Sequence, residues 1–192
     1  MSKLRDWQGM MKLVNIMVGC VLFLMLPVQL QALPSADQSA TNSVQRFVQG
    51  FYDWYVPLAL KEGPFPTIDL ALKEKSFLFS GALAQALHDD SAARAKSPEW
   101  IVGLDGDPFL NAQDPCEQYE AGQATQDGNR YKVEVFRICS GKKGELPDVI
   151  AELEKKGDSW IFINFYYPGD GDLLTELKLL KKDRESHKGK GI

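Results

Sequence analysis

Two cysteines lie at equal distances on either side of an Asp-Gly pair, and no other feature of the sequence constrains the fold as strongly. Cys116 and Cys139 flank Asp127-Gly128, a dipeptide that favours a two-residue β-hairpin turn because both turn positions need a positive φ. If these two residues form the turn, the cysteines face each other across an antiparallel pair, with Cα atoms about 4.5–5.5 Å apart. That separation suits a disulfide, so we predict a hairpin stapled by Cys116 and Cys139. Two free thiols, or a bulge that shifts the register, are the alternatives.

The N-terminus has the organisation of a secretory signal. Its basic residues are Lys3, Arg5 and Lys12. They precede an apolar run over residues 18–26, and small Ala32 offers a cleavage position after a more polar exit. The run is shorter than the ~20 apolar residues that a membrane-spanning helix needs. We therefore predict a signal peptide over residues 1–32, cleaved near Ala32, and a periplasmic location without stable membrane insertion. A membrane-anchored chain with an uncleaved signal is the alternative, and the sequence leaves open whether translation starts at Met10 or Met11.

Cys20 follows Gly19 and in this respect is similar to the lipidated cysteine of a lipoprotein. The apolar run continues beyond it, whereas a lipidated cysteine should end such a run, so we interpret Cys20 as an apolar residue of the signal. Once the signal is removed, Cys116 and Cys139 are left as an even pair, as expected in an oxidising compartment.

Apolar residues then recur at helical spacing and predict the first helix of the domain. They are Val44, Phe47, Val48, Phe51, Tyr55 and Leu58. Residues 33–43 before them are small and polar and predict a flexible leader. A second helical stretch, broken near Ser76 and with Ser80 as the N-cap of its main segment, ends in an Ala-rich run to Ala95. Leucines over residues 173–180 predict a terminal amphipathic helix, and residues 182–192 a charged tail.

Between the helices the apolar period changes to two, which is typical of strands. Four strands are predicted over residues 117–125, 129–139, 149–156 and 159–167. Helices followed by an antiparallel meander indicate an α+β fold. We expect a single domain over residues 44–181, with N-terminal helices packed on a curved, cone-like antiparallel sheet and a C-terminal amphipathic helix.

Composition excludes several classes of protein. Apolar residues make up 44% of the chain and charged residues 25%, which is ordinary for a globular protein and unlike a disordered or multispanning one. The formal net charge is −4 and becomes more negative when the basic signal is removed. An acidic chain without a basic patch repels phosphates, so we expect no binding of nucleic acid.

Three segments of the domain carry a resemblance to a known family. They are the run Phe47-x-x-x-Phe51-Tyr52-x-Trp54-Tyr55, the pair Phe79-Ser80, and Gly103-Leu104-Asp105-Gly106-Asp107-Pro108-Phe109 with Ala112-Gln113-Asp114. Together they resemble the bacterial exported family numbered 3828 among the domains of unknown function, over roughly residues 44–180. The resemblance implies a small periplasmic protein with a cone-like fold of the nuclear-transport-factor-2 type, and it implies no activity.

The densest group of polar side chains lies in the third of these segments. Asp105, Asp107, Asn111 and Asp114 stand at short spacing among Gly and Pro, and carboxylate and amide oxygens of this kind are ligands for Ca²⁺. The EF-hand order is absent, and Asp in an irregular loop also forms Asx turns with its own backbone. We predict a polar loop site, with Ca²⁺ as its candidate cation and no other cofactor.

Aromatic residues supply a second candidate site. Phe51, Trp54, Tyr55 and Tyr166 would line a pocket if they meet in the mouth of the cone, because ligand pockets are largely apolar with a few polar groups. The alternative is that these side chains belong to the core, which is the commoner fate of aromatic residues at helical spacing.

No catalytic motif is present in the sequence. His88 and His187 are the only histidines, and neither stands in a pattern with a nucleophile, a phosphate loop or a metal-binding cysteine. We therefore expect a non-enzymatic binding or adaptor module that engages another envelope protein through its sheet face or cone mouth. Two alternatives remain: a small-molecule binder or cone-type isomerase or hydrolase-like enzyme with a buried carboxylate, and an envelope immunity protein against a secreted toxin.

Overall fold

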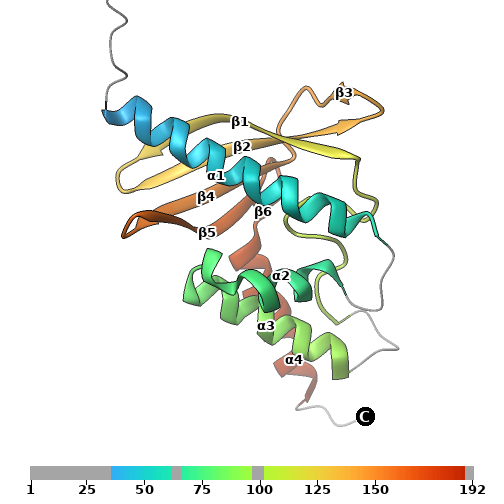
Figure 1. Cartoon of the computed structure of the whole chain (residues 1–192). Coiled ribbons are helices and arrows are strands. Elements are labelled where there is room, and N and C mark those ends of the chain that lie inside the picture. The colour runs from blue at the N-terminus through green and yellow to red at the C-terminus, as the bar shows by residue number, and fades with distance from the viewer. Residues whose placement is uncertain (1–35, 62–65, 97–101, 189–192) are drawn as a thin grey trace, which may run out of the picture. The chain divides into compact units, whose positions relative to one another are not determined.

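The computed structural model describes residues 36–61, 66–96 and 102–188. Within these residues, four α-helices, a short 3₁₀ helix and six strands form the expected α+β domain (Figure 1). The predicted signal peptide and the cleavage position at Ala32 lie outside the described residues.

The first helix, α1 (Ala36–Ala59), begins earlier than the sequence predicts. Residues 36–43, which we expected to be a flexible leader, are helical, although their small polar side chains carry no periodic apolar signal. Each residue added to an existing helix gains one hydrogen bond without a new nucleus, so packing of the later turns of α1 can support these earlier ones. Ser43 also accepts a hydrogen bond from the indole nitrogen of Trp160 at 3.1 Å.

The second helical stretch is broken as predicted. It consists of α2 (Thr67–Lys75), the 3₁₀ helix η1 (Ser76–Leu78) and α3 (Gly81–Lys96). Phe79 is extended at the break and forms a parallel bridge with Phe162. The Ser80 hydroxyl accepts a hydrogen bond from the Leu83 backbone N–H at 3.2 Å, which confirms Ser80 as the N-cap of α3.

All strand pairs of the sheet are antiparallel. The strands are β1 (Gln118–Asp127), β2 (Arg130–Cys139), β3 (Lys142–Lys143), β4 (Val149–Lys156), β5 (Ser159–Tyr167) and β6 (Gly171–Asp172). Their order is β1-β2-β4-β5-β6, with β3 paired to β2. The sheet is not strongly curled (Figure 1), so the pronounced cone that we expected is absent from the described residues.

The hairpin turn lies one residue later than predicted. Asp127 pairs with Arg130, so Gly128 and Asn129 form the turn, and of these two only Gly128 has a positive φ, at 60°. This is the arrangement of a type II′ turn, in which Gly takes the first central position. A bulge between Ala121 and Ala124 then shifts the register of the pair.

The disulfide forms between the predicted cysteines in spite of this shift. Cys116 lies just before β1, Cys139 ends β2, and their Cα atoms are 5.0 Å apart. Continued by one residue, the register beyond the bulge places Glu117 opposite Cys139, so the bridge at the open end of the hairpin joins diagonal rather than directly opposed positions.

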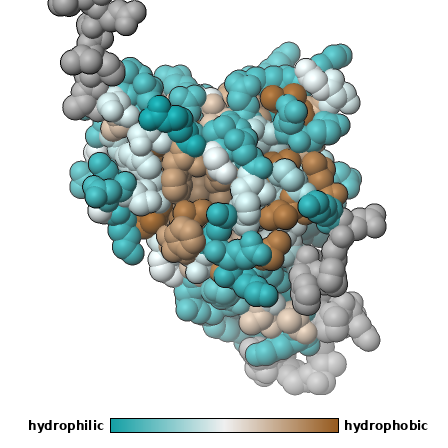
Figure 2. All heavy atoms as spheres, in the orientation of Figure 1, coloured by the Kyte–Doolittle hydropathy of each residue, from teal (hydrophilic) through white to brown (hydrophobic). Residues whose placement is uncertain are grey.

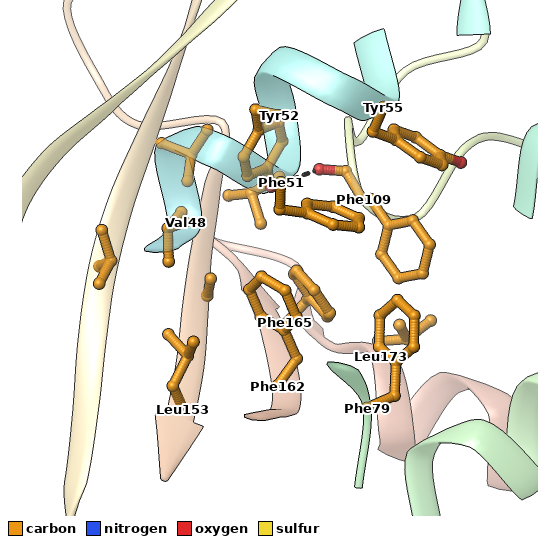
Figure 3. Packing of buried hydrophobic residues seen from close by; sticks show 14 of the residues in the cluster. Val48, Phe51, Tyr52, Tyr55, Phe79, Phe109, Leu153, Phe162, Phe165 and Leu173 are labelled. Atoms are coloured by element: carbon orange, nitrogen blue, oxygen red, sulfur yellow. Dashed lines mark hydrogen bonds between the residues drawn. The ribbon is translucent and has the colours of Figure 1, made fainter. Parts of the chain in front are cut away.

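The core lies between the sheet and the helices, and a second bulge fills it with aromatic rings. Glu152 pairs with Asn164 and Leu153 with Phe162, so Ile163 is the extra residue in β5. Phe162 and Phe165 therefore both face the helices, with ring centroids 5.1 Å apart, below α1 in Figure 3. Figure 2 shows that apolar side chains also reach the surface between α1 and the α2–α3 region.

The terminal helix, α4 (Leu173–Lys188), runs into the segment that the sequence predicts as a tail. Arg184 donates to Asp90 of α3 at 2.7 Å and to the Val102 carbonyl at 2.8 Å. Asp90 is only 1% exposed and also accepts a hydrogen bond from the Leu104 N–H at 3.2 Å. A Cβ on Gly103 would lie 2.5 Å from this carboxylate, so the close approach of the chain to α3 requires glycine here.

Candidate functional site

Four tyrosine hydroxyl groups hold four consecutive residues of the irregular segment that precedes the sheet. They come from α1, β1 and β5, and each donates one hydrogen bond. The pairs of donor and acceptor are Tyr55 to Asp107 Oδ2 (2.6 Å), Tyr167 to the Pro108 carbonyl (3.1 Å), Tyr52 to the Phe109 carbonyl (2.7 Å) and Tyr119 to the Leu110 carbonyl (3.4 Å). We call residues 105–114 the anchored loop. Each such bond contributes on the order of 1 kcal/mol, and leaving a buried carbonyl without its partner costs about 1–3 kcal/mol.

The ring of Phe109 fixes the same loop from within the core. Phe109 is fully buried and stacks on Phe79, with ring centroids 5.3 Å apart. It also meets Phe51 and Tyr55 of α1 edge-on, at 5.6 and 5.3 Å. In Figure 3 the ring lies between α1 above and Phe79 below, so the loop is fixed by packing as well as by hydrogen bonds.

Asp107 organises the backbone of the loop. Its Oδ1 accepts hydrogen bonds from the N–H groups of Phe109 (2.9 Å) and Leu110 (3.2 Å), which is the Asx-type turn that the sequence offers as an alternative. Burial raises the pKa of Asp107 from 3.8 to about 6, and the hydrogen bonds from Tyr55 and from these two N–H groups offset only part of that rise. The loop is therefore built around a carboxyl group that titrates close to neutral pH.

The tyrosines, in contrast, keep their protons. Burial raises the pKa of Tyr52 and Tyr55 well above the usual value, with Asp107 contributing in each case. Burial also raises the pKa of Tyr119 to about 12 and raises that of Tyr167. All four hydroxyls therefore remain donors over the physiological range of pH.

The other residues of the predicted polar site point to separate partners. Asp105 accepts a hydrogen bond from the Gln113 amide at 2.9 Å, and the Asn111 amide donates to the Asp148 carbonyl at 3.2 Å. Asp114 is exposed. The structure thus brings Asp105, Asp107 and Asn111 to the border of one hollow, although each has its own hydrogen-bond partner, and Asp114 is not part of that border. Among the described residues, no group of three or more His, Cys, Asp or Glu is arranged to hold a metal ion.

Two hollows flank the anchored loop. One, of about 260 Å³, is bordered by Arg94 of α3 and Thr67 of α2. The other, of about 350 Å³, is bordered by Tyr167 and by Glu176 of α4. Asp105 and Asp107 line both hollows.

The four aromatic residues predicted to line a pocket do not surround one cavity. Phe51 and Tyr55 are buried in the core, with their rings stacked at 5.3 Å. Trp54 is partly buried at the edge of the core, where Lys75 Nζ lies 4.8 Å from its ring centroid. Tyr166 alternates with core-facing Phe165 and Tyr167 and so lies on the other face of the sheet, where its hydroxyl donates to Glu152 at 3.1 Å.

Sequence reasoning identified Asp107 but missed three of the tyrosines that hold the anchored loop. Tyr52 and Tyr167 lie more than fifty residues from their acceptors along the chain, whereas Tyr119 lies nine residues from Leu110. The sequence placed Tyr52 in a predicted helix and Tyr119 and Tyr167 in predicted strands, without indicating their partners. The available signal was local: a hydroxyl-bearing aromatic residue at a core-facing position needs a polar partner.

Comparisons with known proteins identified no relative of this chain. No family model matches the chain, and searches of curated proteins and of solved structures found no match either. The resemblance to the exported family therefore stays a prediction.

Proposed function

We propose that this protein is a non-enzymatic protein-binding module of the cell envelope and that the anchored loop is part of its contact surface. The observation that carries the proposal is that the loop is firmly held while several of its polar side chains are exposed. Three tyrosine hydroxyls hold its backbone carbonyls, a fourth holds the Asp107 carboxylate, and the Phe109 ring packs in the core. Asp105, Gln113 and Asp114 remain exposed. A loop fixed before it meets a partner loses little conformational freedom on binding.

Further features support this proposal. The Cys116–Cys139 disulfide is consistent with an oxidising compartment, and the N-terminal sequence has the pattern of an export signal. In the part of the chain that the structure describes, no helix has the length and apolar character to cross a membrane. Buried Phe51, Phe109 and Phe162 fill the space between helix and sheet that a cone-type enzyme would use as its site.

Site-specific photo-crosslinking in the producing cell tests the proposal. The photoreactive residue benzoylphenylalanine replaces Gln113 or Asp114 in the loop, or Asn129 in the exposed hairpin turn as a control. We expect one predominant protein adduct from the two loop positions and none from Asn129. The same set of adducts at all three positions, or no adduct at any of them, would remove the loop as a contact surface.

A small-molecule binder is the second candidate, and one specific observation favours it. Asp107, whose pKa is about 6, pairs with Tyr55 at 2.6 Å between the two hollows. A ligand that binds there should raise the thermal midpoint Tm of the wild-type protein more than that of Asp107→Asn. A screen of small polar compounds that raises neither midpoint would remove this candidate.

A further inference from the structure

A third hollow, of about 440 Å³, lies between the second half of α1 and the start of β1. We call it the α1–β1 groove. Its apolar lining includes Val56, Pro57 and Ile138, and it is also lined by Tyr52 and Tyr119. These two tyrosines stack with ring centroids 5.8 Å apart and hold the anchored loop with their hydroxyls. The groove therefore adjoins the anchor of the loop.

Among the residues that the structure describes, the charged side chains that line the groove are acidic. They are Asp53, Glu117 and Glu120. Glu120 is paired with Lys143 at 2.9 Å. Within residues 36–61, 66–96 and 102–188, the hydrogen bonds to the carboxylates of Asp53 and Glu117 come from uncharged groups, the Gln49 amide at 2.7 Å and the Ser140 N–H at 3.0 Å. Backbone N–H donors lower the pKa of Glu117, so its charge persists over a wide range of pH.

Pro57, which also lines the groove, removes one hydrogen-bond donor from α1. It lies inside the last turns of α1 and has no N–H to donate to the carbonyl four residues earlier. That carbonyl belongs to Asp53, whose carboxylate also lines the groove. The Asp53 backbone oxygen therefore lacks its usual helical donor.

The far wall of the groove is rigid. Glu117 follows Cys116 directly and Ile138 precedes Cys139 directly, and these two cysteines are joined. The disulfide thus fixes acidic Glu117 and apolar Ile138 relative to each other before any partner binds.

We infer that the α1–β1 groove binds a basic, extended segment of the partner protein, in which Arg or Lys alternates with apolar residues. This inference rests on the proposed protein-binding function. Long basic side chains lay their apolar stems along surfaces such as that of Pro57 and Ile138, which are exposed and partly exposed, respectively, and keep their charged heads in solvent at the edge of the groove. There the heads meet Asp53 and Glu117, which need donors and a positive charge.

A defined peptide tests the inference on the purified protein. The probe is a capped octapeptide that alternates Arg and Val, and its counterpart alternates Glu and Val. Two-dimensional NMR follows the backbone amides during titration. We expect saturable shifts at Gln49, Tyr119 and Ile138 with the Arg peptide and none with the Glu peptide.

Charge-matched variants separate the groove from general attraction to an acidic protein. Asp53→Asn with Glu117→Gln preserves both hydrogen-bond acceptors and should weaken binding of the Arg peptide at least tenfold. Asp127→Asn with Asp158→Asn removes the same charge near two exposed turns and should change it less than twofold. Equal weakening by both pairs, or shifts that map to the anchored loop instead, would overturn the assignment of the groove.

The two proposals fail in different ways. A specific adduct from Gln113 together with no binding of the Arg peptide in the groove would overturn the inference and leave the protein-binding function in place. A crosslinker at Gln118, on the groove wall, that yields the same adduct as Gln113 would support both. The absence of any protein adduct at Gln113, Asp114 and Gln118 would overturn both proposals.

Discussion

Asp107 holds a proton more tightly in the folded protein than in the unfolded chain, because burial raises its pKa from 3.8 to about 6. Between these two values the folded state binds more protons, so the free energy of unfolding falls as pH rises. We expect a loss of at most about 1.4 kcal/mol per pH unit from pH 4 to pH 6, and no further contribution from this group above that range. Asp107→Asn should remove this component. Urea unfolding of both proteins from pH 4 to pH 7 measures the difference, and parallel curves would contradict the assignment.

Single positions were predictable where the signal was local. The N-cap at Ser80 and the partnership of Cys116 with Cys139 followed from neighbouring residues. The hairpin turn was displaced by one residue because Gly128 can serve as the second position of one turn or the first of the next. The tyrosines that hold the anchored loop were not predictable, because their hydrogen bonds depend on how the elements pack and three of the four partners lie more than fifty residues away along the chain.

The attachment of α4 to α3 depends on a buried ion pair. Arg184→Ala removes the closest cation from Asp90, which is 1% exposed. We expect the free energy of unfolding to fall by about 3 kcal/mol, at the lower end for a broken buried pair, because Arg94 Nε still lies 3.4 Å from this carboxylate. Lys181→Ala on the same helix breaks an exposed pair with Asp89 and should cost at most about 1 kcal/mol. Chemical denaturation compares the two variants, and equal losses would show that Asp90 does not depend on Arg184.

Element limits were predicted best where the apolar pattern and a turn coincided. β4 and β5 occupy the predicted residues because period-two segments meet at a Gly157 turn. The start of α1 and the end of α4 were not predicted, and the physical reason is the same for both. Polar helical turns supported by distant partners, such as Ser43 with Trp160 and Arg184 with Asp90, carry no apolar period.

The disulfide contributes to the stability of the whole domain. Replacing both Cys116 and Cys139 by Ser removes the constraint that their bridge places on the unfolded chain, and we expect a loss of about 3 kcal/mol. Thermal unfolding with and without reductant checks this on the unmodified protein, since reductant should lower its midpoint and leave that of the double variant unchanged. A midpoint that does not respond to reduction would contradict a stabilising role.

The fold class was predictable for the whole molecule because it depends on the order of periodic segments, helices first and strands after. The curvature of the sheet was not, because bulges set it and their positions are not marked in the sequence. The same limit applies to the candidate sites. The acidic loop is visible in the sequence, whereas the α1–β1 groove arises only when packing places Asp53 and Glu117 around one hollow.

Two glutamines of α1 cover part of the free edge of β1, to which a strand of another copy of this chain could otherwise bind. The Gln49 amide donates to the Tyr119 carbonyl and its oxygen accepts from the Ala121 N–H, while Gln45 donates to the Ala121 carbonyl. A helix thus occupies the backbone positions that a neighbouring strand would use. Exposed strand edges are where amyloid-like stacking and strand exchange begin, so these two side chains protect this part of β1 from polymerisation.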